Sequence, residues 1–186
     1  MDPLRIAVQR PIGSTGTVPV TGGVPLPEGG VPAGAQLTLY DSVGTVVSLQ
    51  SEVLATWDDG SARWALLDFL CTPGDTIQTF CLGLGDPGEI RPGIRALAEP
   101  VGIEGLGLGL VVPEGGLLAV PGQFQIDMEL VTADGVLCCA FAESAVVETA
   151  GPVRGTLSLR GSFRRPDGER VFQFRMRASV FEGLGL

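Results

Sequence analysis

Hydrophobic residues recur at every second position through most of the chain. The first such segment is residues 4–8, where apolar Leu4, Ile6 and Val8 share one face. A period of two is that of a β-strand with one buried face, whereas a helix repeats every three or four residues. No segment has a helical period, so we predict an all-β protein. Before residue 83 we expect strands at residues 4–8, 36–41, 46–50, 52–57, 62–71 and 76–82.

Glycine and proline punctuate this pattern, with 28 Gly and 14 Pro in the chain. Turn sequences such as Asp58-Asp59-Gly60 separate the alternating segments, because Gly adopts positive φ without a steric clash. Residues 13–34 are so rich in both residue types that we predict a long loop there. Six short strands within about eighty residues are typical of a small barrel. We therefore predict a six-stranded β-barrel over residues 1–84.

The second half repeats the strand pattern after a Gly- and Pro-rich connector, residues 83–100. We place a domain boundary in this connector. We predict that residues 85–186 form part of an antiparallel β-sandwich, because the last two strands are long and carry Arg on one face. Because the chain stops just after a strand, we expect a piece of a longer protein or an edge completed by a partner. The strands expected here are residues 106–112, 117–120, 124–132, 136–142, 145–150, 153–162 and 171–181.

The side-chain inventory excludes several kinds of active site. The chain has no His, and all 12 of its basic residues are Arg. Ser-His-Asp and Cys-His catalysis, a Schiff-base lysine and a Walker A phosphate loop are therefore impossible within it. The cysteines show no C-x-x-C spacing, so we predict no metal site and no cofactor. The sequence leaves open the disulfide state of Cys71, Cys81, Cys138 and Cys139.

The net charge of −9 is distributed unevenly. Residues 1–150 hold five Arg against eighteen acids, a net charge of −13, whereas residues 151–186 hold seven Arg against three acids, a net charge of +4. The net negative charge of residues 1–150 argues against nucleic acid as the main partner. The basic segment is either a polyanion patch or the solvated face of a strand, and the alternation of its Arg with apolar residues favours the second. No stretch approaches the ~20 apolar residues that span a bilayer, so we expect no membrane partner.

One predicted hairpin contains both tryptophans of the chain. Trp57 and Trp64 flank its acidic turn, and Arg63 precedes the second tryptophan. These three residues are candidates for binding carbohydrate, because sugar rings stack on aromatic faces and Arg pairs with carboxylates. The alternative is structural: the tryptophans pack in the core or clamp the turn. In that case Arg63 forms a local ion pair with Asp58 and Asp59.

Three strings of the sequence resemble one protein family. They are GVPLPEGGV at residues 23–31, LTLYDSVGTVVSLQSEVLATWDDGSARWALLDF at residues 37–69, and GPVRGTLSLRGSFRRPDGERVFQFRMRASVF at residues 151–181. They are similar to the N-terminal region of the exo-rhamnogalacturonan lyase and YetA-like family, and the hairpin WDDGSARW is the most specific piece. The resemblance implies a six-stranded RIFT-type barrel followed by an all-β segment that leads into a larger catalytic body.

The same resemblance implies a function. The family is expected to cleave pectic or related acidic polysaccharides by β-elimination on a helical toroid, which a sequence without helical segments does not contain. We therefore expect a non-catalytic accessory region of a polysaccharide lyase-like protein, with no activity and no catalytic residue of its own. Its partners would be an acidic polysaccharide or a missing C-terminal catalytic domain. The resemblance favours an extracellular location, although residues 1–10 lack the features of a signal peptide.

A different class of function competes with this one. High glycine content and an unfinished last strand also suit a self-assembling β-rich structural subunit of a filament, capsid or tail. Such a subunit would form homo-oligomers by sharing strands between protomers.

Overall fold

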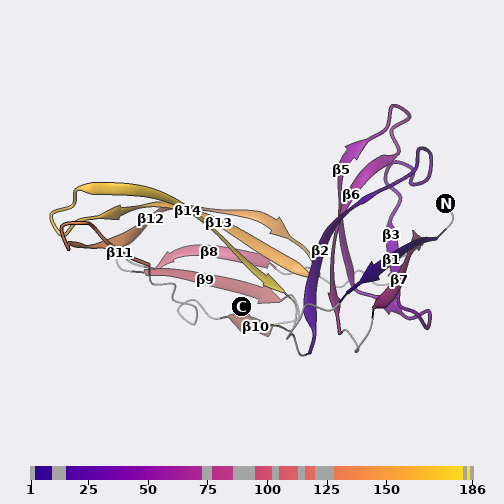
Figure 1. Cartoon of the computed structure of the whole chain (residues 1–186), viewed down its shortest axis with the longest axis horizontal. Coiled ribbons are helices and arrows are strands. Elements are labelled where there is room, and N and C mark those ends of the chain that lie inside the picture. The colour runs from indigo at the N-terminus through magenta and orange to yellow at the C-terminus, as the bar shows by residue number, and fades with distance from the viewer. Residues whose placement is uncertain are drawn as a thin grey trace. The chain divides into compact units, whose positions relative to one another are not determined.

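The computed structural model describes residues 3–9, 16–72, 77–85, 95–101, 105–112, 116–119, 128–181 and 184 (Figure 1). All regular structure among these residues is β-strand, and all paired strands are antiparallel. The predicted all-β class is therefore confirmed. Residue contacts divide the chain into two compact units, Met1–Arg91 (unit 1) and Pro92–Leu186 (unit 2). Within the described ranges, no helix is long and apolar enough to cross a membrane.

Unit 1 contains two antiparallel sheets around one hydrophobic core. The first has the strand order β1-β7-β3-β4, and the second has the order β2-β6-β5. The seven strands described in this unit are the six that we expected and β2, while closure into a six-stranded barrel stays a prediction. Their bounds are β1 (Leu4–Val8), β2 (Val18–Pro25), β3 (Leu37–Tyr40), β4 (Val46–Val47), β5 (Leu49–Thr56), β6 (Ala62–Cys71) and β7 (Gln78–Leu84).

Alternate residues of β6 build the centre of this core. Ala65, Leu67 and Phe69 are each at most 1% exposed. Phe69 meets Phe80 of β7 edge-on, with ring centroids 5.1 Å apart and an interplanar angle of 64°. Full burial of a large apolar side chain stabilises the fold by about 1.5–3 kcal/mol. The aromatic pair thus joins the two sheets of unit 1 across its interior.

Strand β2 lies in the segment for which we predicted a loop, and that prediction is wrong. β2 pairs with β6 in continuous register, from Val18 opposite Cys71 to Pro25 opposite Trp64. Because β2 is an edge strand of its sheet, proline residues without an N–H are tolerated in it. The valines of β2 pack against the core, so the alternation was present but was hidden by the glycines and prolines between them.

Several other strand boundaries also differ from the prediction. The break between β4 and β5 falls at Ser48 rather than at Ser51, and β8 (Arg95–Val101) occupies most of the predicted connector's second half. The strands predicted at residues 136–142 and 145–150 form one continuous strand, β12 (Leu137–Ala150). Bulges near residues 143 and 148 interrupt its alternation without ending it. Residues 124–127, which begin the strand predicted at residues 124–132, lie outside the described residues.

Unit 2 contains a long four-stranded sheet and a three-stranded sheet (Figure 1). The long sheet has the order β11-β12-β13-β14, the short one has the order β10-β9-β8, and β8 packs against β12 and β13. β9 agrees with the strand expected at residues 106–112. The remaining bounds are β9 (Gly105–Val112), β10 (Gly116–Ala119), β11 (Glu129–Val131), β13 (Arg154–Arg164) and β14 (Arg170–Phe181).

One type of hairpin loop recurs four times among the described residues and confirms the turns predicted at these four places. Each loop closes with two backbone hydrogen bonds, of which one is donated by a glycine to the carbonyl three residues before it. That glycine has positive φ, as a type I turn followed by a G1 bulge requires. The glycines are Gly44 (φ 85°), Gly60 (φ 82°), Gly135 (φ 81°) and Gly168 (φ 90°).

Candidate functional site

The tip of the β5–β6 hairpin, residues 57–64, is hydrogen-bonded to the segment that follows β2. The amide of Leu26 donates to the carbonyl of Arg63 at 2.9 Å, and the amide of Ala62 donates to the carbonyl of Val31 at 2.9 Å. Leu26 and Val31 are 2% and 1% exposed and belong to the core cluster. The hairpin tip is therefore anchored to the core on one side.

The acidic turn of this hairpin is held by its own serine. Oδ1 of Asp59 accepts hydrogen bonds from the amide and the hydroxyl of Ser61, at 2.9 and 2.6 Å. Oγ of Ser61 in turn accepts the amide of Gly29 at 2.9 Å. The hydrogen bonds from Ser61 hold the pKa of Asp59 below its ordinary value of 3.8. The sequence D-G-S thus links two neighbouring turns.

Trp57 and Arg63 form one aromatic–cation contact at the tip. The indole N–H of Trp57 donates to the carbonyl oxygen of Leu26 at 3.0 Å, and the ring is half-buried. The guanidinium carbon of Arg63 lies 4.8 Å from the ring centroid. In the described part of the chain Arg63 makes no ion pair with Asp58 or Asp59, so the local ion pair that we considered is wrong. Arg63 contacts the Trp57 ring rather than a carboxylate because an exposed ion pair contributes little to stability, whereas a cation–π contact contributes about 0.5–1 kcal/mol.

Trp64 is the more accessible of the two tryptophans. It is 42% exposed, and its indole lies across the backbone of Gly23 in β2, where a Cβ would be 2.5 Å from the indole nitrogen. The missing side chain of Gly23 therefore makes the space that the ring occupies. With one side supported and much of its surface exposed, Trp64 can offer apolar ring surface to a ligand.

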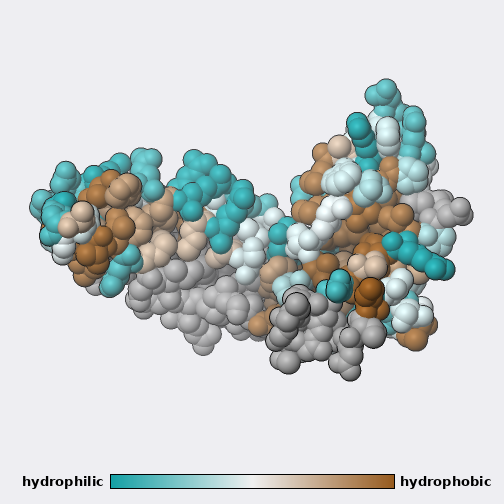
Figure 2. All heavy atoms as spheres, in the orientation of Figure 1, coloured by the Kyte–Doolittle hydropathy of each residue, from teal (hydrophilic) through white to brown (hydrophobic). Residues whose placement is uncertain are grey.

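A second candidate lies on the long sheet of unit 2, on the face that we call the arginine face. By register, the side chains of β11–β14 on this face include six arginines and three glutamates, an excess of three positive charges. Figure 2 shows hydrophilic side chains gathered over this part of unit 2. This is the polar face that the alternation of the last strands predicted. The charged residues are Arg154, Arg160, Arg164, Arg170, Arg175, Arg177, Glu129, Glu143 and Glu148.

Two glutamates of β12 each bind a pair of these arginines. Glu148 contacts Arg175 at 2.5 Å and Arg177 at 2.7 Å. Glu143 contacts Arg164 and Arg170, both at 3.1 Å. Each carboxylate is therefore shared by two guanidinium groups, so each of these groups of three side chains keeps an excess of positive charge.

These contacts shift the acidity of both glutamates. The pKa of Glu143 is held below its ordinary value of 4.5 by hydrogen bonds, first from the hydroxyl of Ser162 and then from Arg164. Burial alone would raise the pKa of Glu148, but hydrogen bonds from Arg175 and Arg177 outweigh it and hold the pKa below 4.5. Both carboxylates are therefore ionised at neutral pH.

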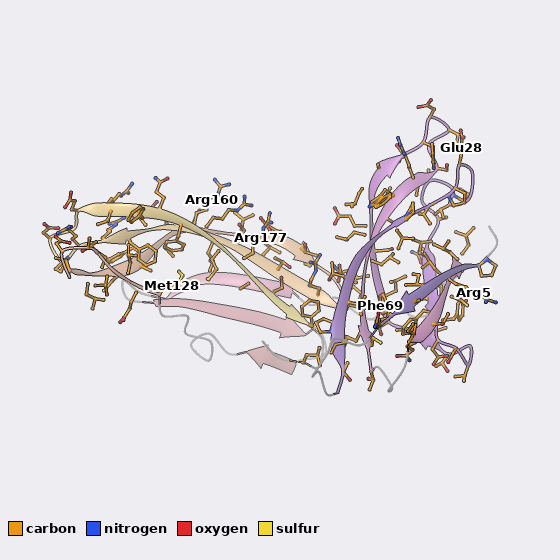
Figure 3. All side chains as sticks on the ribbon, in the orientation of Figure 1. Arg5, Glu28, Phe69, Met128, Arg160 and Arg177 are labelled. Carbon is orange, nitrogen blue, oxygen red and sulfur yellow. The ribbon has the colours of Figure 1, made fainter. Side chains whose placement is uncertain are left out.

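Arg160 differs from the other arginines of this face. Among the described residues no carboxylate lies within ion-pair distance of it, and it is exposed. Figure 3 shows Arg160 extending away from β8 and β9. It borders an open depression of about 300 Å³ that is also lined by Ser144, Val146, Glu148, Ser158 and Arg175.

A comparison with known families finds a match within the first half of the chain. Residues 9–69 match the family model of the PcRGLX-like N-terminal RIFT barrel domain. The matched residues lie within unit 1. The match confirms the resemblance expected for residues 23–31 and 37–69, and it covers the hairpin that carries Trp57, Arg63 and Trp64. The resembling string at residues 151–181 lies outside the match. No curated protein matches the chain.

Within the matched residues, the three predicted site residues lie together at the hairpin tip, but their surroundings differ. Trp57 and Arg63 are occupied by contacts with each other and with the backbone, whereas Trp64 has an exposed ring. Their role in binding carbohydrate stays a prediction. Sequence reasoning missed Asp68 of β6, a carboxylate that is 2% exposed and accepts the hydroxyl of Thr21 at 2.6 Å. The alternation of β6 does not reveal it, because Asp68 is buried on the face opposite to Phe69.

The cysteines and acidic residues form no metal site in the described parts of the chain. No group of three or more His, Cys, Asp or Glu is placed to hold a metal ion there. All four cysteines are free. Cys138 is buried and Cys139 is exposed, as adjacent residues of one strand should be. Cys71 is buried in the core, and this burial raises the pKa of its thiol.

Proposed function

We propose that the chain is a non-catalytic accessory region of a lyase-like protein and that it associates with acidic polysaccharide. The observation that carries the proposal is the match of residues 9–69 to the PcRGLX-like N-terminal RIFT barrel domain. Its partner would be a catalytic domain of the same kind of protein. Composition supports the non-catalytic role. β-Elimination needs a base for the proton α to a carboxylate and a cation for the charge that develops, and a chain without His or Lys offers Tyr40 and Arg for these roles.

Trp64 is the residue of the RIFT barrel domain that we assign to sugar contact. Its ring is 42% exposed and is supported by the backbone of Gly23. Arg63 directly precedes Trp64 on β6 and is held over Trp57 at 4.8 Å, so that the tip presents one exposed ring and one stacked guanidinium. A ring that is ordered before the ligand arrives loses little conformational entropy on binding.

Two measurements test this proposal on the whole chain. Electrophoresis through gels that contain polygalacturonate or a neutral glucan should show retardation only with polygalacturonate; equal mobility in both gels and in a gel without polysaccharide would remove the association with acidic polysaccharide. Incubation with pectic polysaccharides should release no unsaturated uronic product, which is detected by its ultraviolet absorbance. Sustained product formation that scales with protein concentration would contradict the non-catalytic role.

Self-assembly is a second candidate, and one observation favours it. β14 has 12 residues and ends the strand order of its sheet, and Phe172 on it is 60% exposed. A long edge strand with an exposed aromatic residue can pair with another copy. Light scattering coupled to size exclusion separates the two candidates, because a monomer whose mass is independent of concentration excludes strand sharing.

A further inference from the structure

We infer that the arginine face of unit 2 is an anion-binding surface centred on Arg160, and that it takes the carboxylates of an extended acidic polysaccharide. The identity of the ligand rests on the proposed function, whereas the site rests on the geometry of β12, β13 and β14. Nothing in the match to the RIFT barrel domain assigns this surface, because that match ends at residue 69.

The first argument is the placement of like charges. Arg160 of β13 lies directly opposite Arg175 of β14 in the register of the sheet. Like charges in directly opposed positions of an antiparallel pair destabilise the pair. Glu148 relieves this repulsion from one side only, because its two oxygens bind Arg175 and Arg177. An anion between Arg160 and Arg175 would extend the pattern in which Arg164 and Arg170 share Glu143 and Arg175 and Arg177 share Glu148.

The second argument is the shape of the surface at that point. Arg160 and Arg175 border the same open depression of about 300 Å³, together with the exposed hydroxyl of Ser144. This volume is at the lower end for sites that hold small ligands. Guanidinium groups bind carboxylates through two parallel hydrogen bonds, and a hydroxyl beside them can bond to a sugar hydroxyl.

The third argument is the repetition of charge along the strands. Arg175 and Arg177 are two residues apart on β14, so their Cα atoms are separated by about 7 Å along one face. Arg160 lies on the neighbouring strand β13, and its Cα atom is about 5 Å from the Cα atom of Arg175, which lies opposite it. Several cations at such spacings suit a polymer that carries repeated anionic groups better than they suit one isolated ion.

Polysaccharide is favoured over nucleic acid by the lining of the depression. The lining of the depression contains no aromatic ring on which a base could stack. Hydroxyl and guanidinium groups are the chemistry that a carboxylated sugar requires.

The decisive experiment compares two single-charge variants of the full chain. Arg160→Gln removes an exposed cation without an ion pair, and Arg5→Gln removes an exposed cation from β1 of unit 1. Both should unfold thermally like the parent chain. Dissociation constants are measured with polygalacturonate, with its fully methyl-esterified form, and with single-stranded oligodeoxythymidylate.

We expect Arg160→Gln to weaken polygalacturonate binding roughly tenfold, the loss of about one charge-assisted hydrogen-bonded pair. Arg5→Gln should change it less than twofold, and the methyl ester should bind no better to the parent chain than to Arg160→Gln. Equal weakening by the two variants, or unchanged binding by Arg160→Gln, would overturn the site. Tighter binding of the oligodeoxythymidylate than of polygalacturonate would overturn the ligand class. If the parent chain binds polygalacturonate and Arg160→Gln binds it equally, only this inference fails; if the parent chain does not bind it, the proposed association fails as well.

Discussion

A Cβ atom on Gly23 would lie 2.5 Å from the indole nitrogen of Trp64. The two residues are on the paired strands β2 and β6, with Gly23 opposite Leu66 and Pro25 opposite Trp64. Their side-chain positions share one face of the sheet, because residues two apart on a strand point the same way. The bare backbone at Gly23 therefore gives the tryptophan ring its place.

Gly23→Ala should destabilise the protein by about 1–2 kcal/mol, since the new methyl group displaces the ring of Trp64. Gly22→Ala is the matched control, because a Cβ at Gly22 would meet nothing within 4 Å. That control should be neutral or slightly stabilising. Free energies of unfolding from denaturant titrations provide the measurement. The penalty should disappear when Trp64→Ala is also present, and a penalty that persists there would show that the ring is not its cause.

Ser61→Ala should cost about 1–2 kcal/mol, because it removes the oxygen that the amide of Gly29 donates to and the hydroxyl that bonds to Asp59. Ser61 is 3% exposed, so water does not readily replace these bonds. Ser42→Ala, at an exposed position in the corresponding loop before Gly44, is the control and should be close to neutral. A loss of stability of equal size in both variants would mean that the hydrogen bond between Gly29 and Ser61 does not stabilise the fold.

The sequence predicted most of unit 1 because its signals were local. Turn glycines and period-two alternation located β1, β3, β6 and β7 to within about two residues. β2 was missed because its evidence is tertiary: Gly23 is explained only by the ring of Trp64, which lies forty-one positions further along the chain. A composition rich in Gly and Pro predicts a loop unless the partner strand is known.

The candidate sites also divide into features with a local sequence signal and features that depend on tertiary structure. Alternation in residues 153–181 predicted that the arginines share one face, since that requires only the period of a strand. It did not predict which arginines are neutralised. Glu143 and Glu148 reach them from β12, across strand pairings that depend on the bulges near those two residues. Arg160 could therefore be distinguished from its neighbours only in the folded sheet.

Acid should weaken unit 2 through Glu143. The pKa of this carboxyl in the folded state lies below its ordinary value of 4.5 because Ser162, Arg164 and Arg170 favour the ionised form. Its contribution to stability is therefore fully present above pH 4.5 and is lost as the pH falls through the lowered folded value. Melting temperatures between pH 7 and about pH 3 should fall less steeply for Glu143→Gln than for the parent chain.

The control for this pH dependence is Glu129→Gln. Glu129 is exposed on β11, and no ion pair links it to another described residue. Its variant should follow the parent chain over the same pH range. If Glu143→Gln also follows the parent chain, the arginine contacts of Glu143 are too weakly coupled to folding to affect stability.

The two candidate binding surfaces should respond differently to salt. Trp64→Ala removes an exposed ring, so it should weaken polysaccharide binding several-fold at low and at high salt alike. Trp64→Phe keeps an aromatic face and should retain most of the affinity. Arg160→Gln should weaken binding only at low salt, because interactions between exposed charges are screened within about 3 Å at 1 M ionic strength. Titrations of polygalacturonate at low salt and near 1 M salt check both expectations. A Trp64→Ala effect that vanishes in high salt would assign the tryptophan an electrostatic or structural part, rather than a stacking contact with sugar.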